Sequence, residues 1–98
     1  MSYRLSGKAE DDIISVYLDG VRDFGVAQAE RYHKELEQVF GILAGNPYLA
    51  RMRGELTPSV RIHPHGSHLI VYHVEDNEDV LILRIRHARE DWVSNPET

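Results

Sequence analysis

A chain of 98 residues is too short for several domains, since chains usually divide only beyond about 250 residues, so we expect a single domain over residues 1–98. It is 42% hydrophobic and 28% charged, the composition of an ordinary globular protein. Its formal net charge is −5, which argues against a surface that binds nucleic acid by displacing counterions, so direct nucleic-acid binding is not expected. The sequence has no cysteine, which excludes disulfides, thiolate metal sites and thiol nucleophiles.

Apolar segments in this sequence are short. None approaches the roughly 20 residues that a membrane helix needs, and the first seven residues lack the apolar stretch of a signal peptide. We therefore expect a cytoplasmic protein that does not contact a membrane.

The first half of the chain predicts a short strand and two helices. Tyr3–Leu5 alternates like a strand, and Ser6 is a suitable N-cap for a helix of about four turns that ends near Gly25. A second helical series ends at Gly45-Asn46-Pro47, where glycine permits a left-handed stop and proline prevents continuation. Joined by a tight turn, the two helices should pack antiparallel. The apolar positions that recur at spacings of three and four are Ala9, Ile13, Val16, Tyr17, Gly20, Val21 and Phe24, then Ala29, Tyr32, Leu36, Val39, Phe40 and Leu43.

The second half changes to strand periodicity. Three runs rich in β-branched residues, Val60–His63, His68–Val74 and Val80–His87, are separated by the polar connections Pro64–Gly66 and Glu75–Asp79. Consecutive runs are most simply antiparallel neighbours. The predicted fold is therefore α+β: an N-terminal strand and an antiparallel helical hairpin, packed on a mainly antiparallel four-stranded sheet.

Strict alternation in the last run predicts which side chains meet the helices. It assigns Ile85 and His87 to the helix-facing side, together with Leu81 and Leu83. The opposite, open face would then carry Val80, Ile82, Arg84 and Arg86. We therefore expect both arginines to project from the open face.

Basic residues also have an uneven distribution. Every basic residue after Lys34 is arginine, and Leu81–Arg89 holds three arginines and one histidine without an acid. Guanidinium groups on a sheet can stabilise a phosphate or a carboxylate while an imidazole exchanges a proton, or they can form a docking surface. In the simpler alternative, the arginines pair with acids in Glu75–Asp79 or with Glu90 and Asp91.

Two other clusters have a plain structural interpretation. His63, His65 and His68 could share a metal, but no cysteine or neighbouring carboxylate completes the ligand set, so a solvated turn and no metal are expected. Three acids at residues 10–12 stabilise the positive end of a helix dipole more simply than they form a catalytic pair. No phosphate-loop, dinucleotide-binding or zincin motif occurs, so we expect no cofactor.

Taken in order, these elements and their motifs resemble the ParE toxins of the RelE/ParE superfamily. The resemblance implies the toxin of a type II toxin–antitoxin system, which inhibits DNA gyrase without catalysis of its own and is neutralised by a ParD-type antitoxin. The residues that carry it are Tyr3–Ser6, Ala9, Tyr17, Phe24-Gly25, Gln28-Ala29, Tyr32, Leu36, Phe40, Leu43-Ala44, Pro47, Val60-Arg61, Ser67–Tyr72 and Ile82–Trp92.

The RelE branch of the superfamily supplies the alternative, a ribosome-dependent endoribonuclease of messenger RNA. Its catalytic set here would be Arg61, Arg84, Arg86 and His87. No tyrosine follows Tyr72, and the net charge is acidic, so both features favour gyrase over the ribosome. A third hypothesis is an inactivated toxin that is retained as a binding module.

The resemblance also implies two contact surfaces. An antitoxin would fill a groove between the helical hairpin and the sheet, unless the apolar residues that line it are wholly internal. The residues expected to contact the antitoxin are Tyr17, Val21, Tyr32, Leu36 and Arg61. Those expected to contact the target are Arg84, Arg86, Arg89 and Trp92, although Trp92 could instead cover the edge of the sheet.

Overall fold

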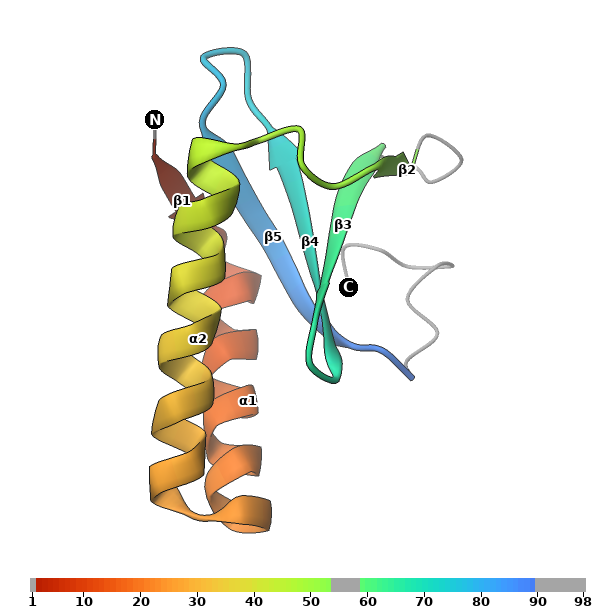
Figure 1. Ribbon diagram of the computed structural model, residues 1–98. Helices are drawn as coiled ribbons and strands as arrows, with labels where there is room; N and C mark the ends of the chain where they lie inside the picture. Colours follow the sequence, from red (N-terminus) through yellow and green to blue (C-terminus); the bar gives the residue numbers. More distant parts are fainter. Residues whose placement is uncertain (1, 54–58, 90–98) are drawn as a thin grey trace.

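A computed structural model describes residues 2–53 and 59–89 of the chain. Two antiparallel helices cover one face of a five-stranded sheet of order β1-β5-β4-β3-β2, and the hairpin extends past one end of the sheet (Figure 1). No helix in the described part of the chain is both long and apolar enough to cross a membrane. The elements are β1 (Tyr3–Leu5), α1 (Gly7–Phe24), α2 (Val26–Gly45), β2 (Met52–Arg53), β3 (Val60–His65), β4 (His68–Val74) and β5 (Val80–His87).

The helical hairpin follows the local signals in the sequence. The Ser6 side chain accepts a hydrogen bond of 3.0 Å from the backbone N–H of Ala9, which caps α1. Gly25 lies between the helices at φ 92°, a conformation that glycine adopts without steric cost. A Cβ added at Gly20 would lie 3.3 Å from the Cβ of Ala29, so two small residues allow the helices to approach closely. The predicted strand and hairpin are confirmed.

The sheet is antiparallel except at one edge, where β1 pairs parallel with β5. The predicted meander β3-β4-β5 is confirmed. The sheet has one strand more than predicted, because the two-residue strand β2 pairs antiparallel with the start of β3. Two residues are too few to give an alternating pattern, which explains why the sequence did not indicate this strand.

The core lies between α2 and the middle strands. Burying Leu36, Phe40 and Leu43 stabilises the fold by about 1.5–3 kcal/mol for each side chain. Tyr72 is fully buried, and its hydroxyl donates to Pro47 O at 2.9 Å and accepts from Ala50 N at 3.3 Å. Tyr72 therefore ties the connection after α2 to the sheet. The other residues of this core include Ala9, Ala50, Ile70, Val80, Ile82 and Ile85.

The predicted alternation along β5 is wrong for its first half. Val80 and Ile82 are buried in the core beneath the helices, whereas Leu83 packs with a second cluster around Val60 and Val71. A β-bulge explains the change, because Tyr72 pairs with Ile82 while the neighbouring Val71 pairs with Arg84, leaving Leu83 as an extra residue. The residues after the bulge, Ile85 and His87, follow the prediction: the first is in the core and the second contacts the helix side.

The prediction that Arg84 and Arg86 project from an open face is also wrong. The guanidinium of Arg84 forms a bidentate ion pair with Asp12 of α1, with N–O distances of 2.6 and 2.9 Å, and both side chains are largely buried. Arg86, opposite Leu69 in β4, is only 8% exposed. Arg84 thus has an internal ion pair, but the partner is Asp12, which the sequence assigned to the helix dipole, and not one of the acids that the simpler alternative named.

Asp12 also replaces a missing strand. β1 ends at Leu5, so no strand of the described residues pairs with β5 beyond Ile82 on this side. There the Asp12 carboxylate accepts a hydrogen bond of 2.9 Å from the backbone N–H of Ile85. The Asp12 side chain thus accepts a hydrogen bond from a backbone N–H at the edge of the sheet and binds Arg84 at the same time.

Candidate functional site

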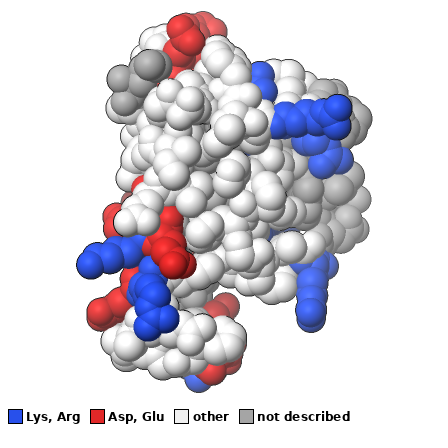
Figure 2. Space-filling view, viewed as in Figure 1, with Lys and Arg blue, Asp and Glu red and all other residues white. Residues whose placement is uncertain are grey.

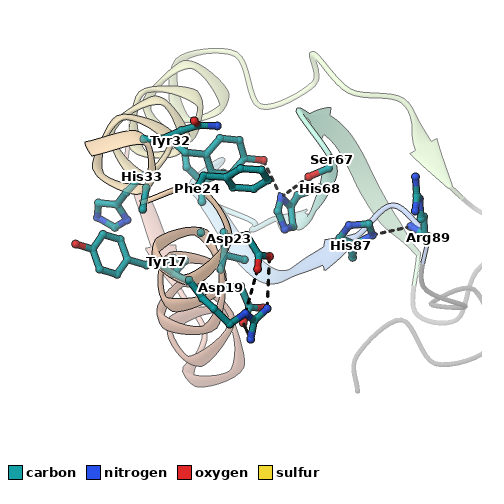
Figure 3. Close-up of a pocket in the computed structure, with 17 residues that line it drawn as sticks. Tyr17, Asp19, Asp23, Phe24, Tyr32, His33, Ser67, His68, His87 and Arg89 are labelled. Atoms are coloured by element: carbon teal, nitrogen blue, oxygen red, sulfur yellow. Dashed lines mark hydrogen bonds and ion pairs between the residues drawn. The ribbon is translucent and has the colours of Figure 1, made fainter. Parts of the chain in front are cut away.

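A groove of about 650 Å³ opens where the helical hairpin extends past the sheet (Figure 3). Both helices form one wall, and the β3–β4 turn with the end of β5 forms the other. The lining residues are Ile13, Val16, Tyr17, Asp19, Gly20, Arg22, Asp23, Phe24, Gln28, Ala29, Tyr32, His33, Leu36, Ser67, His68, His87 and Arg89.

The floor of the groove is apolar. Ile13, Val16 and Leu36 line it from α1 and α2, and Leu36 also belongs to the core. Phe24, at the end of α1, is 66% exposed although it is a large hydrophobic residue. Exposed aromatic surface next to an apolar groove is typical of a site that another macromolecule covers.

Tyr32 is the centre of a polar cluster at the sheet wall. Its hydroxyl lies 2.9 Å from His65 O and 2.7 Å from His68 Nδ1. A phenol has one hydrogen, so both bonds form when the hydroxyl donates to the carbonyl and His68 Nδ1–H donates to the phenol oxygen. Burial raises the pKa of Tyr32, so the hydroxyl remains protonated in the neutral pH range.

The turn beneath Tyr32 requires glycine. Gly66 has φ 57°, and a Cβ at this position would lie 2.8 Å from the Tyr32 hydroxyl oxygen. No other residue fits without displacing the ring that joins α2 to the turn.

His87 lies across the strand pair from His68, with ring centroids 5.5 Å apart. Its Nδ1 accepts a hydrogen bond of 3.1 Å from the backbone N–H of Arg89. Because Nδ1 is the acceptor, the ring hydrogen of neutral His87 is on Nε2.

The two walls of the groove differ in charge. On α1, Arg22 pairs with both Asp19 and Asp23, at 3.4 and 3.1 Å, so two carboxylates against one guanidinium leave one negative charge. The sheet wall carries the cation of Arg89 beside two imidazoles. In Figure 2, acidic and basic side chains adjoin around the helices, whereas the basic side chains on the sheet side have no acidic neighbour among the described residues seen in that view.

Comparison with known proteins identifies the family. Residues 3–92 match the model of the ParE toxin of the type II toxin–antitoxin system parDE. Toxin ParE1 of Mycobacterium tuberculosis strain H37Rv is 32% identical over 89 residues, which cover 91% of each chain. Toxin ParE of Escherichia coli is 30% identical over 93 residues, 95% of this chain and 90% of the relative. This chain belongs to the ParE toxin family.

A solved structure supports the fold of this ParE-family chain. The structure described as the chromosomal ParDE TA system from P. aeruginosa matches with a TM-score of 0.73 at 23% identity. The match covers 89% of this chain and 95% of that one. Similarity at this identity extends to the fold, so the predicted ParE-like architecture is confirmed.

The residues predicted to contact an antitoxin are divided between two places. Tyr17, Tyr32 and Leu36 line the groove, whereas Val21 is half-buried on α1 and is not part of the lining among the described residues. Arg61 lies on β3, where its Nη1 donates to Ala50 O at 2.7 Å. Its guanidinium also lies 4.9 Å from the ring centroid of Tyr48.

The residues predicted for target contact are also separated. Arg89 is exposed at the groove, Arg84 is held at the β5 edge by Asp12, and Arg86 is buried. Trp92 lies outside the described residues.

The alternative nuclease set is not collected in one cavity of the described chain. His87 lines the groove, whereas Arg61 contacts Ala50 on the connection after α2. Arg84 is paired with Asp12. The described residues place these groups at different parts of the sheet.

Sequence reasoning missed several residues of the groove. Ser67 and His68 carried part of the family resemblance, and His68 was also weighed in a histidine cluster, but neither was assigned to a contact surface. The described residues contain no group of three or more potential ligands arranged for a metal. Asp19 and Asp23 were not singled out. The signal that could have found His68 is its position opposite His87 when β4 and β5 are paired as a hairpin.

Proposed function

We propose that this ParE-family toxin acts in the cytoplasm, inhibits DNA gyrase and is neutralised by a ParD-type antitoxin that fills the groove. Membership of the family supports the toxin role, and the name of the similar structure, a ParDE system, supports a two-protein assembly. The open groove with its exposed apolar border is the observation that carries the proposal.

An antitoxin in the groove would cover surface that is costly to leave in water. Phe24 is the most exposed large hydrophobic residue of the described chain, and Tyr17 and Tyr32 present ring surface beside it. A helix with one apolar face is the element that best fits a groove between a helical hairpin and a sheet. Contacts of Val21 and Arg61 with the antitoxin stay predictions from the family resemblance.

Target contact is assigned to the C-terminal end of β5. Arg89 is exposed there, and Trp92 follows three residues later. Arg84 and Arg86 contribute by positioning this end of the strand, because the first is paired with Asp12 and the second is buried.

Inducing the chain in bacteria tests the proposed function. DNA breaks, an SOS response and filamentation would support gyrase as the target. Cleaved transcripts and halted translation would favour the ribonuclease, and normal growth would favour an inactivated toxin. Arg89→Ala should weaken toxicity while the matched substitution Arg31→Ala, also exposed but on α2, should not.

Antitoxin recognition is tested with the protein encoded by the neighbouring reading frame. Co-expression should restore growth, and the two proteins should purify together. Phe24→Asp should weaken the complex because it places a charge at the apolar border. If the complex forms equally well with Phe24→Asp and with Tyr32→Ala, the antitoxin docks elsewhere.

A further inference from the structure

We propose that the C-terminal segment, residues 90–98, folds back and docks on the face of the sheet that the helices leave uncovered. Trp92 is the apolar anchor of this contact, and Glu90 or Asp91 pairs with Arg86. Such docking goes beyond the proposed function, because it gives the second face of the sheet a partner within the chain and does not involve the groove. A contact of Trp92 with a target then requires release of the segment from the sheet.

The sheet carries a second apolar cluster on the face opposite the helices. Val71 lies between the core residues Ile70 and Tyr72 in β4, so its side chain points away from the helices. Val60 and Val71 are 1% and 0% exposed, although both helices lie on the other face and no element of the described chain is stacked on this one (Figure 1). The partly buried residues packed against these two are Ile62, Leu69 and Leu83.

The sequences of the two central strands indicate the same cover. An antiparallel strand with one solvated face alternates apolar and polar residues, whereas a strand buried on both faces is apolar throughout. Leu69–Tyr72 in β4 and Val80–Leu83 in β5 are apolar or aromatic at every position. Both runs therefore predict that the helix-free face is covered in the folded protein.

The segment after β5 has the length and the starting point to cover this cluster. The last described residue is Arg89, which follows β5 by two positions. Residues 90–98 can extend about 30 Å, enough to run back along β5, whose eight residues span about 27 Å. Trp92 is the third residue of the segment, so its indole can reach Leu69 and Arg86, which pair with one another near that end of the sheet.

Arg86 adds a charge requirement on the same face. It lies directly opposite Leu69 in the register, so the two side chains share the helix-free side, and it is only 8% exposed. A guanidinium buried to this degree is stable beside an anion. Glu90 and Asp91 directly precede Trp92 in the sequence. One short stretch of the segment therefore supplies both the carboxylate and the apolar anchor.

The other internal segment outside the described residues cannot cover the whole cluster. Residues 54–58 connect β2 to β3, and Arg53 pairs with Val60, so both ends of this connection lie at the start of β3. Leu83 belongs to β5, which is separated from β3 by β4. The C-terminal segment is the part of the chain whose reach includes all three strands.

Trp92 is the one tryptophan of the sequence, so its fluorescence reports the docking in the full-length toxin. The emission should be blue-shifted and protected from acrylamide, because the indole is held in an apolar site. Leu69→Asp places a charge in that site and should move the emission to that of a solvated indole, with a severalfold steeper quenching slope. His73→Asp, at an exposed position further along β4, is the matched control and should change neither.

A milder substitution keeps the test decisive if Leu69→Asp prevents folding. Leu69→Ala removes contact area without introducing a charge, and it should increase quenching of Trp92 by a smaller amount. Circular dichroism and urea unfolding would establish that each variant is folded.

The ion pair is tested by neutralising the two acids of the segment. Glu90→Gln combined with Asp91→Asn should increase quenching of Trp92, because Arg86 then loses its carboxylate partner. Asp76→Asn combined with Glu78→Gln, in the exposed β4–β5 turn, is the matched control and should have no effect. Unchanged quenching in the first variant would refute the pairing with Arg86.

Three outcomes would overturn the docking itself. A solvated Trp92 in the unmodified toxin would show that the segment does not bind the sheet. Shielding that persists in both Leu69 variants would place the indole elsewhere, such as the edge of the sheet. Shielding that disappears on dilution would identify a second copy of the chain as the occupant of this face. Toxicity and antitoxin binding are measured separately, so none of these results bears on the proposed function.

Discussion

The two ends of the basic segment Leu81–Arg89 lie in different environments. The side chain of Arg84 is largely buried, and its guanidinium is bound by Asp12, which also accepts a hydrogen bond from the Ile85 N–H at the edge of the sheet. Five residues later Arg89 is exposed at an open groove, with His87 beside it. Two arginines from one charged run therefore differ in burial and partners because α1 covers one end of the strand and extends away from the other. Sequence proximity alone does not assign such residues to one site.

The Asp12 contact should have the largest effect on stability. Asp12→Ala removes the carboxylate that binds the Arg84 guanidinium and the Ile85 N–H in a largely buried place, so it should lower the free energy of unfolding by about 2–3 kcal/mol. Urea unfolding measures this. Asp11→Ala, at an exposed position next to it, should change stability by no more than about 0.5 kcal/mol. Equal effects would mean that Asp12 acts only through the helix dipole.

Substituting the glycine of the β3–β4 turn should have the second-largest effect on stability. Gly66→Ala introduces a Cβ that meets the Tyr32 hydroxyl at 2.8 Å on backbone with φ 57°, so a loss of about 1–2 kcal/mol is expected. Thermal or urea unfolding measures the loss. The control is Gly41→Ala in α2, where a Cβ meets nothing within 4 Å; it should stabilise the protein by about 0.5–1 kcal/mol. A neutral Gly66→Ala would show that Tyr32 is not held against this turn.

Alkaline pH should lower the free energy of unfolding through two tyrosines, Tyr32 and Tyr72. Burial raises the pKa of Tyr32 and of Tyr72 above that of a free tyrosine, so the folded chain keeps protons that the unfolded chain releases. This contribution to stability is fully present below about pH 10 and is lost as pH rises through the higher folded-state pKa. Urea unfolding between about pH 9 and pH 11 should show the decline, and Tyr72→Phe should make it shallower. An unchanged slope in that variant would contradict the assignment.

Arg89 should have the smallest effect on stability. Arg89→Ala should leave the free energy of unfolding within about 0.5 kcal/mol because its side chain is exposed, yet it should weaken toxicity on induction. Arg84→Ala should instead destabilise the protein, lowering the free energy of unfolding by about as much as Asp12→Ala. Comparing unfolding and growth for the two variants sharpens the distinction between the ends of β5. If Arg89→Ala lowers the free energy of unfolding and Arg84→Ala does not, the distinction between the two ends is contradicted.

Local signals account for what the sequence predicted well. Ser6 caps α1, Gly25 separates the helices, and the polar connection Glu75–Asp79 separates two strands, so these elements are encoded by residues close in the chain. The bulge at Leu83 depends on how β5 pairs with β4, and alternation within one strand cannot reveal it. The Asp12–Arg84 pair joins residues 72 apart and needs the assembled sheet edge.

The groove was predictable only in part for the same reason. Periodicity placed Tyr32 and Leu36 on the inner face of α2, and family resemblance suggested a groove beside them. Its polar wall depends on the contact of Tyr32 with His68, which belongs to a strand 36 residues away. No local pattern indicates that contact. The sequence therefore predicted the apolar residues of the groove and its basic residues His87 and Arg89, whereas the contact of Tyr32 with His68 is evident only in the folded chain.

The central claim is that the groove between the hairpin and the sheet receives the antitoxin. Hydrogen–deuterium exchange of the toxin, alone and with the protein encoded beside it, tests this most directly. The account predicts slower exchange along α1 near Asp19–Phe24, along α2 near Tyr32 and at the β3–β4 turn. Slower exchange confined to β2 and the helix-free face of the sheet, with the groove unchanged, would contradict it.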